Sequence, residues 1–140
     1  MRTYLLTVPD PLPAGPVPLV VGFHGGFGFL FRNRFRSGGD QFRTTSRLDE
    51  QAAERGFIAA FPDGTVDADG TGIVAVARTW NAGRCCGPAR YLEVDDLAFF
   101  DALVADVARA HEVDAGHVLV TGHSNGAMMA FRLACERPAD

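Results

Sequence analysis

One serine near the end of the printed sequence has the surroundings of a nucleophile. Ser124 stands between Gly122 and Gly126 in the pattern glycine-x-serine-x-glycine. The run "VLVT" before it predicts a strand and "AMMAFRLA" after it predicts a helix, so Ser124 falls in a tight strand-to-helix turn. The glycines let the chain segments approach closely, and the helix dipole points toward the serine oxygen. The pattern predicts a nucleophilic serine, and a purely structural serine is the alternative.

A second short motif could supply the partner that a serine nucleophile needs. His24, Gly25 and Gly26 follow the predicted strand "LVVGF". A backbone N–H of Gly26 or Phe27, together with that of Asn125, would stabilise the oxyanion formed when a serine attacks a carbonyl carbon. His24 is then expected to orient the loop and not to act as the base. A glycine turn without chemistry is the alternative interpretation.

The general base that would activate Ser124 is harder to find. The four histidines, at positions 24, 111, 117 and 123, all precede the serine, and none follows it. His111 and His117 are expected at the far end of the strand before Ser124, and the adjacent His123 should point away from it. We therefore expect this chain to be the N-terminal portion of a longer enzyme. A genuine short form is the alternative, as is a non-catalytic protein that only binds a ligand.

Composition excludes several other classes of function. The 140 residues are 47% apolar and 21% charged, and the net charge is −4, which argues against a nucleic-acid partner. The basic run "RNRFR" (32–36) is expected to be a solvated loop, with a small anion-binding patch as the alternative. No apolar stretch approaches the roughly 18 residues that cross a membrane. The histidines and cysteines lack the spacing of metal ligands, and no cofactor is expected.

The order of predicted elements indicates a single α/β domain over residues 1–140. Strands are expected at 2–9, 19–26, 57–64 and 116–122, and helices at 44–56, 93–114 and 126–138. Ser46 and Gly56 are the expected ends of the first helix, and a long loop is expected at 65–90. Helices that alternate with apolar strands predict a mainly parallel sheet flanked by helices.

Three cysteines leave two possibilities open. Cys85 and Cys86 are adjacent, and Cys135 lies far along the chain. Adjacent cysteines rarely pair with each other, because the ring strains the peptide between them. Either Cys85 or Cys86 could form a disulfide with Cys135, or all three could be buried thiols that act as small apolar groups.

Taken together, these motifs resemble one known family. The stretches that carry the similarity span nearly the whole chain in the family's order: "VVGFHGG", "GFIAAFPDGT", "WNAGRCCG", "VDDLAFFDALV" and "VDAGHVLVTGHSNGAMMAFRLACE". The chain is similar to the polyhydroxybutyrate depolymerase and feruloyl esterase family of α/β-hydrolases. The continuation "SNGAMM" is the most specific part, and it speaks against a serine peptidase of the same fold, the related alternative.

The resemblance implies an extracellular serine esterase with an incomplete α/β-hydrolase fold. Its substrate would be an ester-linked polymer or a feruloylated or acetylated plant polysaccharide. The start "MRTYLLTVPDP" does not look like a signal peptide, so a cytoplasmic location stays open.

The family's pattern also assigns roles to single residues. Ser124 would be the nucleophile, and the loop Gly25–Phe27 with Asn125 would form the oxyanion hole. Trp80 and Asn81 would flank the mouth of the site, although Trp80 could equally be a core aromatic. Asp95 and Asp96 are expected to cap a helix or form a structural ion pair. Because triads of this fold follow the order serine, acid, histidine, the acid and base are expected beyond residue 140.

Overall fold

The computed structural model describes residues 2–26, 37–66 and 77–137. Phe27 and the basic run 32–36 therefore lie outside the described residues. In chain order, the elements are β1 (Tyr4–Thr7), β2 (Val17–Phe23), α1 (Gly38–Ser46), α2 (Leu48–Arg55), β3 (Ile58–Pro62), α3 (Pro88–Tyr91), α4 (Asp96–Ala110), β4 (Val113–Gly122) and α5 (Asn125–Glu136).

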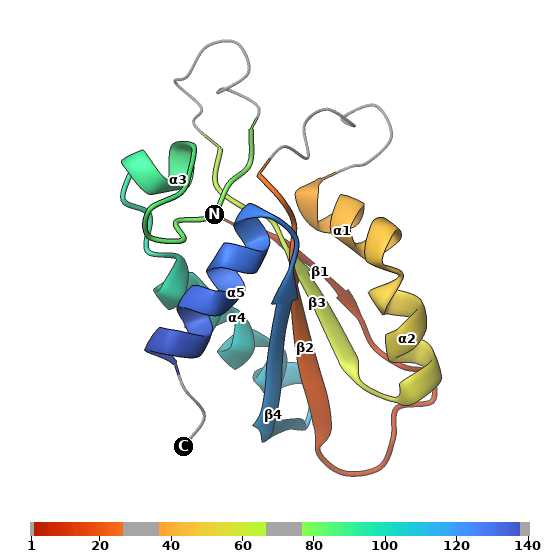
Figure 1. Cartoon of the computed structure of the whole chain (residues 1–140). Coiled ribbons are helices and arrows are strands. Elements are labelled where there is room, and N and C mark those ends of the chain that lie inside the picture. The colour runs from red at the N-terminus through yellow and green to blue at the C-terminus, as the bar shows by residue number, and fades with distance from the viewer. Residues whose placement is uncertain (1, 27–36, 67–76, 138–140) are drawn as a thin grey trace.

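These strands form one sheet between two layers of helices (Figure 1). The strand order is β1-β3-β2-β4, in which β2 runs parallel to both β3 and β4, and β1 runs antiparallel to β3. Helices α1 and α2 cover one face of the sheet, and α4 and α5 cover the other. The predicted α/β architecture with a mainly parallel sheet is confirmed.

The core follows from the alternation of side chains along the strands. On β2, Val17, Leu19, Val21 and Phe23 are all buried against the layer of α4 and α5. Every residue of β3 is buried, as expected for a central strand with a helix layer on each face. Burial of each large side chain contributes about 1.5 to 3 kcal/mol to folding, so this central pair of strands anchors the whole arrangement.

The first helical segment differs from the prediction. Ser46 does not begin a helix: it is the last residue of α1, and Arg47 at φ 55° separates α1 from α2. The cap of α1 is Ser37, whose hydroxyl accepts a hydrogen bond from the backbone N–H of Asp40 at 3.1 Å. The prediction missed α1 because its first two residues are glycines, which propensity alone reads as loop. Gly56, at φ 75°, ends α2 as predicted.

The two glycines at the start of α1 lie so close to β2 and β3 that no side chain fits there. A Cβ at Gly38 would lie 2.7 Å from the imidazole Cε1 of His24, and one at Gly39 would lie 3.0 Å from the carbonyl carbon of Phe61. Contacts this short require glycine, so the start of α1 packs directly on the ends of β2 and β3. Tertiary packing, rather than helix propensity, decides the residue type at these positions.

The two aspartates at the start of α4 have structural roles, as predicted. The Asp95 carboxylate caps α4 by accepting a hydrogen bond from the Ala98 N–H at 2.9 Å. Asp96 is buried and pairs with the guanidinium of Arg2. Arg2 also donates to the carbonyl of Asp63 at 3.0 Å and stacks on the Phe99 ring, 3.7 Å from its centroid. The N-terminal segment is thereby tied to α4 and to the end of β3.

Strand β4 begins earlier and is less buried than predicted. It lies at an edge of the sheet, and among the described strands it pairs only with β2. Val118 and Val120 pack against the core, whereas Leu119 is 52% exposed. No helix in the described part of the chain is long and apolar enough to span a membrane.

Candidate active site

Ser124 occupies the sharp turn between β4 and α5. Its backbone dihedrals are φ 52° and ψ −121°, in a region that disfavours side chains and that costs about 1 to 3 kcal/mol to hold. The turn is fixed on both sides, since the His123 N–H donates to the Phe23 carbonyl at 3.1 Å and the Gly126 N–H donates to the His123 carbonyl at 2.9 Å. The Ser124 side chain makes no capping hydrogen bond to the helix, so its hydroxyl is not committed to a structural role there.

Both glycines of the motif are needed for close packing. A Cβ at Gly122 would lie 2.5 Å from the carbonyl carbon of Gly126, and one at Gly126 would lie 2.6 Å from the carbonyl carbon of Phe23. The first turn of α5 therefore rests directly on the end of β2. This approach holds the Ser124 turn against the chain segment that carries the second motif.

The His24–Gly26 loop lies beside that turn, although about one hundred residues separate the two in sequence. A Cβ at Gly25 would lie 3.5 Å from the Cβ of Ser124, and one at Gly26 would lie 3.5 Å from the Cβ of Asn125. The structure thus brings Gly25 and Gly26 next to Ser124 and Asn125, as the sequence motifs suggested. Phe27 lies outside the described residues.

His24 supports this loop through both of its ring nitrogens. Its Nε2 accepts a hydrogen bond from the Gly64 N–H at 2.9 Å, so the proton belongs on Nδ1, which donates to the Gly25 carbonyl at 2.8 Å. Burial lowers the pKa of His24, because the charged imidazolium would lose its hydration, and the bond to Gly25 opposes this only in part. A neutral, fully bonded imidazole is suited to holding the loop and not to accepting a proton from Ser124.

Asn125 and Trp80 form a buried clamp that the motifs did not reveal. The Oδ1 of Asn125 accepts from the Trp80 N–H at 2.7 Å, and its Nδ2 donates to the Trp80 carbonyl at 3.0 Å. The Trp80 indole Nε1–H donates to the His24 carbonyl at 2.9 Å, and its ring meets that of Phe23 edge-on at 4.9 Å. Trp80 is thus a core aromatic that links the two motifs. The only sign of this clamp in the sequence is the amide side chain of Asn125, directly after the predicted nucleophile.

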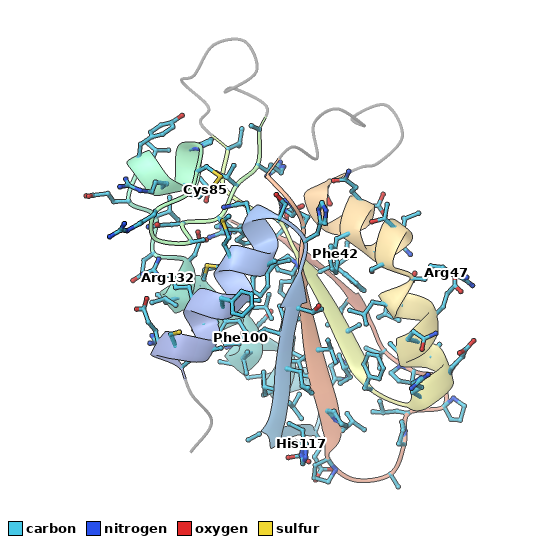
Figure 2. All side chains as sticks on the ribbon, in the orientation of Figure 1. Phe42, Arg47, Cys85, Phe100, His117 and Arg132 are labelled. Atoms are coloured by element: carbon cyan, nitrogen blue, oxygen red, sulfur yellow. A yellow bond between two sulfur atoms is a disulfide. The ribbon has the colours of Figure 1, made fainter. Side chains whose placement is uncertain are left out.

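Asn81, the other residue expected at the mouth of the site, is engaged in the scaffold. Its N–H donates to the Asp96 carboxylate at 2.6 Å, and its side-chain Nδ2 donates to the Val94 carbonyl at 3.0 Å. Its carbonyl accepts a hydrogen bond from the Arg132 guanidinium at 2.6 Å. Arg132 projects from α5 and is labelled in Figure 2. These bonds connect the loop after Trp80 to α4 and α5.

The predicted pairing of Cys85 or Cys86 with Cys135 is wrong, as is the alternative of three buried thiols. Cys85 and Cys86 form a disulfide with each other across a cis peptide bond, and Cys135 is free and exposed. The reason is distance: the Cys85 carbonyl lies 3.5 Å from the Nδ2 of Asn125, the first residue of α5. Cys135 comes ten residues later on that helix, about 15 Å away, which no disulfide spans.

No histidine in the described residues is hydrogen-bonded to the Ser124 hydroxyl. His111 follows the last turn of α4. His117 lies toward the start of β4 (Figure 2), seven residues before the serine, which is about 20 Å along a strand. The Nδ1 of His117 pairs with the Asp114 carboxylate at 2.8 Å on the surface. The imidazole of His123 lies against Gly25, its Nδ1 3.0 Å from where a Cβ would stand there. The described residues also contain no cluster of side chains that could hold a metal ion.

Comparisons with known proteins bear on this geometry. No protein-family model matches the chain. A curated protein, "Putative esterase NocK" of Nocardia uniformis subsp. tsuyamanensis, is 30% identical over 139 residues, which are 98% of this chain and 35% of that protein.

Two solved structures of a substituted pOPH protein also superpose on the chain. The form in complex with DMSO has a TM-score of 0.68 and 20% identity, and the form with pNPB has a TM-score of 0.67 and 18% identity. Each match covers 97% of this chain and 43% of the solved one. The chain spans about a third of the length of the curated relative and less than half of the length of the solved structures. It folds into part of an α/β-hydrolase fold.

Proposed function

We propose that residues 1–140 are the nucleophile-bearing, N-terminal portion of an α/β-hydrolase domain that cleaves carboxylic esters. The observation that carries this proposal is the position of Ser124, held at φ 52° at the start of α5 with its hydroxyl free of the helix. Strain of this kind is kept where the surroundings over-determine it, and it commonly serves reactivity. The 30% identity to a protein named as an esterase supports the same chemistry.

In this proposal the Ser124 Oγ attacks the ester carbonyl carbon while a base removes its proton. The carbonyl oxygen becomes an oxyanion, and collapse of the tetrahedral intermediate releases the alcohol, which takes the proton from the base. Water then attacks the acyl-enzyme, and its proton passes through the same base to Ser124 as the acid leaves. Over the whole cycle the proton that Ser124 loses leaves with the alcohol, and a proton from water restores the Ser124 hydroxyl.

The oxyanion would be bound by backbone N–H groups that the clamp holds in place. As the first residue of α5, Asn125 has an N–H without an acceptor inside the helix, and the helix dipole favours negative charge there. Gly26, where a Cβ would lie 3.5 Å from that of Asn125, lies in the second loop and would provide or position the other donor. A preorganised donor of this type contributes about 2.7 to 4 kcal/mol to catalysis.

The general base and its acid partner are proposed to come from polypeptide beyond the matched portion. The imidazoles of His24 and His117 are hydrogen-bonded to other groups, none of the described histidines is hydrogen-bonded to the Ser124 hydroxyl, and the chain spans only 35% of the curated relative. A ligand-binding protein without catalysis is the second candidate, and the missing bond from a histidine to Ser124 favours it for the 140-residue chain by itself.

The substrate class rests on the resemblance of "SNGAMM" and the neighbouring stretches to polymer and plant-polysaccharide esterases. We propose an extracellular enzyme for polyhydroxyalkanoate, feruloyl or acetyl esters. Comparing hydrolysis of hydroxybutyrate oligomers, methyl ferulate and acetylated xylan by a complete form would rank these three. Equal activity on all of them, or on small esters alone, would count against a polymer substrate.

The function is tested with a fluorophosphonate and p-nitrophenyl acetate. The 140-residue chain is compared with a chimera that joins, after residue 140, the segment that follows the matched region in the Nocardia relative. We expect the chimera to be labelled at Ser124 and to release nitrophenolate, Ser124→Ala to abolish both, and the exposed Ser46→Ala to leave them unchanged. A folded chimera that is neither labelled nor active would refute the esterase proposal.

A further inference from the structure

The disulfide between Cys85 and Cys86 encloses the peptide unit that joins these two residues. A bond between the side chains of adjacent residues closes a small ring, and the Cys85 carbonyl carbon and the Cys86 nitrogen are members of that ring. The ring restricts rotation of the backbone on either side of this peptide unit. Glycines flank it, with Gly83 at φ 85° and Gly87 at φ 76°, and glycine by itself constrains the backbone least. The ring, rather than the neighbouring residues, therefore sets the direction of the Cys85 carbonyl.

The carbonyl in this ring completes the hydrogen bonding of the Asn125 side chain. The two hydrogens of the Asn125 amide are donated to the carbonyls of Trp80 and Cys85, at 3.0 and 3.5 Å. Asn125 is 2% exposed, so an amide hydrogen that lost its acceptor would find little water in its place. A hydrogen bond of 3.5 Å is long and weak, and it cannot fix the position of its own acceptor. The covalent ring does this instead.

The residues after the disulfide reach the second motif loop through Thr79. A Cβ at Gly87 would lie 2.6 Å from the Thr79 Cγ2, and the Thr79 hydroxyl accepts a hydrogen bond from the Ala89 N–H in α3 at 3.0 Å. The same Thr79 methyl group would lie 3.3 Å from a Cβ at Gly26. Figure 1 shows α3 at the same end of the molecule as the turn between β4 and α5. The segment around the disulfide thus contacts Asn125 directly and Gly26 through Thr79.

We propose that the Cys85–Cys86 disulfide is a positioning group of the candidate site, and that its reduction loosens the wall that holds Asn125. Both cysteines are partly exposed, so a small thiol can reach them. The catalytic consequence rests on the proposed function, because the Asn125 N–H has an oxyanion to bind only if Ser124 attacks an ester. The effect on the Asn125 side chain does not rest on it.

Reduction by a dithiol such as dithiothreitol opens the ring. One thiolate of the reagent attacks a cysteine sulfur and breaks the S–S bond, which leaves a mixed disulfide and a thiolate on the other cysteine. The second thiol of the reagent then displaces the first cysteine, and the reagent leaves as a cyclic disulfide. The reagent has supplied both electrons, and Cys85 and Cys86 end as thiols. The Cys85 carbonyl is then free to rotate away from Asn125.

The first test is nuclear magnetic resonance of the side-chain amides in the 140-residue chain. Cys135→Ser removes the free cysteine, so that only the disulfide responds to dithiothreitol. We expect reduction to make the Asn125 amide hydrogens exchange with water about tenfold faster, and reoxidation to restore the slow rate. Adding Cys85→Ser and Cys86→Ser should give the fast rate without any reagent.

Asn81 provides the matched control for this test. Its side-chain amide donates to the Val94 carbonyl at 3.0 Å and should exchange at the same rate before and after reduction. If the Asn125 amide is unchanged by reduction and by the double substitution, the proposal is overturned. It is overturned equally if the Asn81 amide accelerates as much as that of Asn125, because the disulfide then holds the fold as a whole.

The second test is hydrolysis of p-nitrophenyl acetate by the chimera described above, again with Cys135→Ser. The reduced chimera is freed of dithiothreitol without air, and its active sites are counted by fluorophosphonate labelling. Reduction should lower kcat about tenfold and change KM less than about twofold, compared with the roughly hundredfold cost of losing a whole oxyanion donor. The chimera with Cys85→Ser and Cys86→Ser should keep the lower kcat whether or not it has been treated, which excludes an effect of cysteines in the added segment.

Failure of this proposal is distinguishable from failure of the proposed function. A faster Asn125 amide together with a folded but inactive chimera would support the role of the disulfide and refute the esterase proposal. An active chimera whose kcat is the same before and after reduction would overturn the role of the disulfide and leave the esterase proposal standing.

Discussion

The side chain of Asn125 is hydrogen-bonded to both the N–H and the carbonyl of Trp80, at 2.7 and 3.0 Å. Because Trp80 in turn donates to the His24 carbonyl, one buried chain of bonds connects the Ser124 turn to the loop that faces it. The position of the proposed oxyanion donors is therefore set in part by Trp80, a fully buried residue outside both motifs.

Asn125→Ala should destabilise the chain by about 2 to 4 kcal/mol, because it leaves the buried Trp80 N–H without a partner and removes one of the two hydrogen bonds to the Trp80 carbonyl, which keeps the bond from the Ala82 N–H. Urea unfolding followed by circular dichroism measures this loss. Met128→Ala, on the exposed side of the same helix, is the matched control and should change stability by less than about 0.5 kcal/mol. If the two substitutions have equal effects, the clamp contributes nothing to stability.

Gly126→Ala should destabilise the chain by more than about 3 kcal/mol, or prevent folding, although helix propensity alone would favour alanine by about 1 kcal/mol. The new Cβ would lie 2.6 Å from the carbonyl carbon of Phe23, and this backbone cannot yield without moving α5 away from β2. Thermal unfolding is the measurement. Gly116→Ala provides the comparison, since its Cβ would meet only the Asp114 carboxylate at 3.4 Å. A stable Gly126→Ala chain would refute the packing argument.

Stability should fall as the pH drops below about 6.5, the ordinary pKa of histidine. Burial lowers the pKa of His24, so the unfolded chain binds a proton in a range where the folded chain does not, and protonation then favours unfolding. Above pH 6.5 both states are neutral and the effect is absent.

Denaturant unfolding tests this when it is measured between pH 5 and pH 8 at steps of about half a pH unit. The exposed His117→Asn variant should keep the same slope, because the effect belongs to the buried ring. A stability that is constant or that rises toward pH 5 would contradict the assigned role of His24.

The phenol of Tyr4 should ionise at a higher pH than an ordinary tyrosine. Burial and the hydrogen bond that it donates to Asp106 raise the pKa of Tyr4 to about 12. Since the sequence has two tyrosines, Tyr91→Phe leaves Tyr4 as the only one, and phenolate absorbance then reports it directly. The raised pKa means that stability from this contact is lost as the pH rises above 10. A titration midpoint near pH 10 would show that the Tyr4 phenol is exposed to water and does not donate a hydrogen bond to Asp106.

Local patterns predicted the parts of the fold that depend on local sequence. The apolar strands β2 and β3, the amphipathic helix α4 with its Asp95 cap, and the glycine-x-serine-x-glycine turn could all be recognised from residue types and spacing. In each of them the residue preferences agree with the tertiary contacts, so the pattern and the fold give the same answer.

Other features depend on contacts between distant residues and could not be predicted in this way. Gly38 and Gly39 are glycines because His24 and Phe61 leave no space for a side chain there, and two glycines in sequence indicate a loop rather than the helix that they begin. The Asn125–Trp80 clamp joins residues 45 positions apart. The separation of Cys135 from Cys85 becomes clear only once α5 is known to begin beside Cys85.

The contact between Arg2 and Trp80 bears on the fluorescence of the protein. Its guanidinium covers the Trp80 ring at 5.1 Å from the centroid, and Trp80 is the only tryptophan in the sequence. The intrinsic emission of the protein therefore comes from a single indole at the wall between the two motif loops, screened from water by the second residue of the chain. Proteolytic trimming of the amino terminus would expose that indole, and the resulting red shift would report on the wall of the site without any added dye.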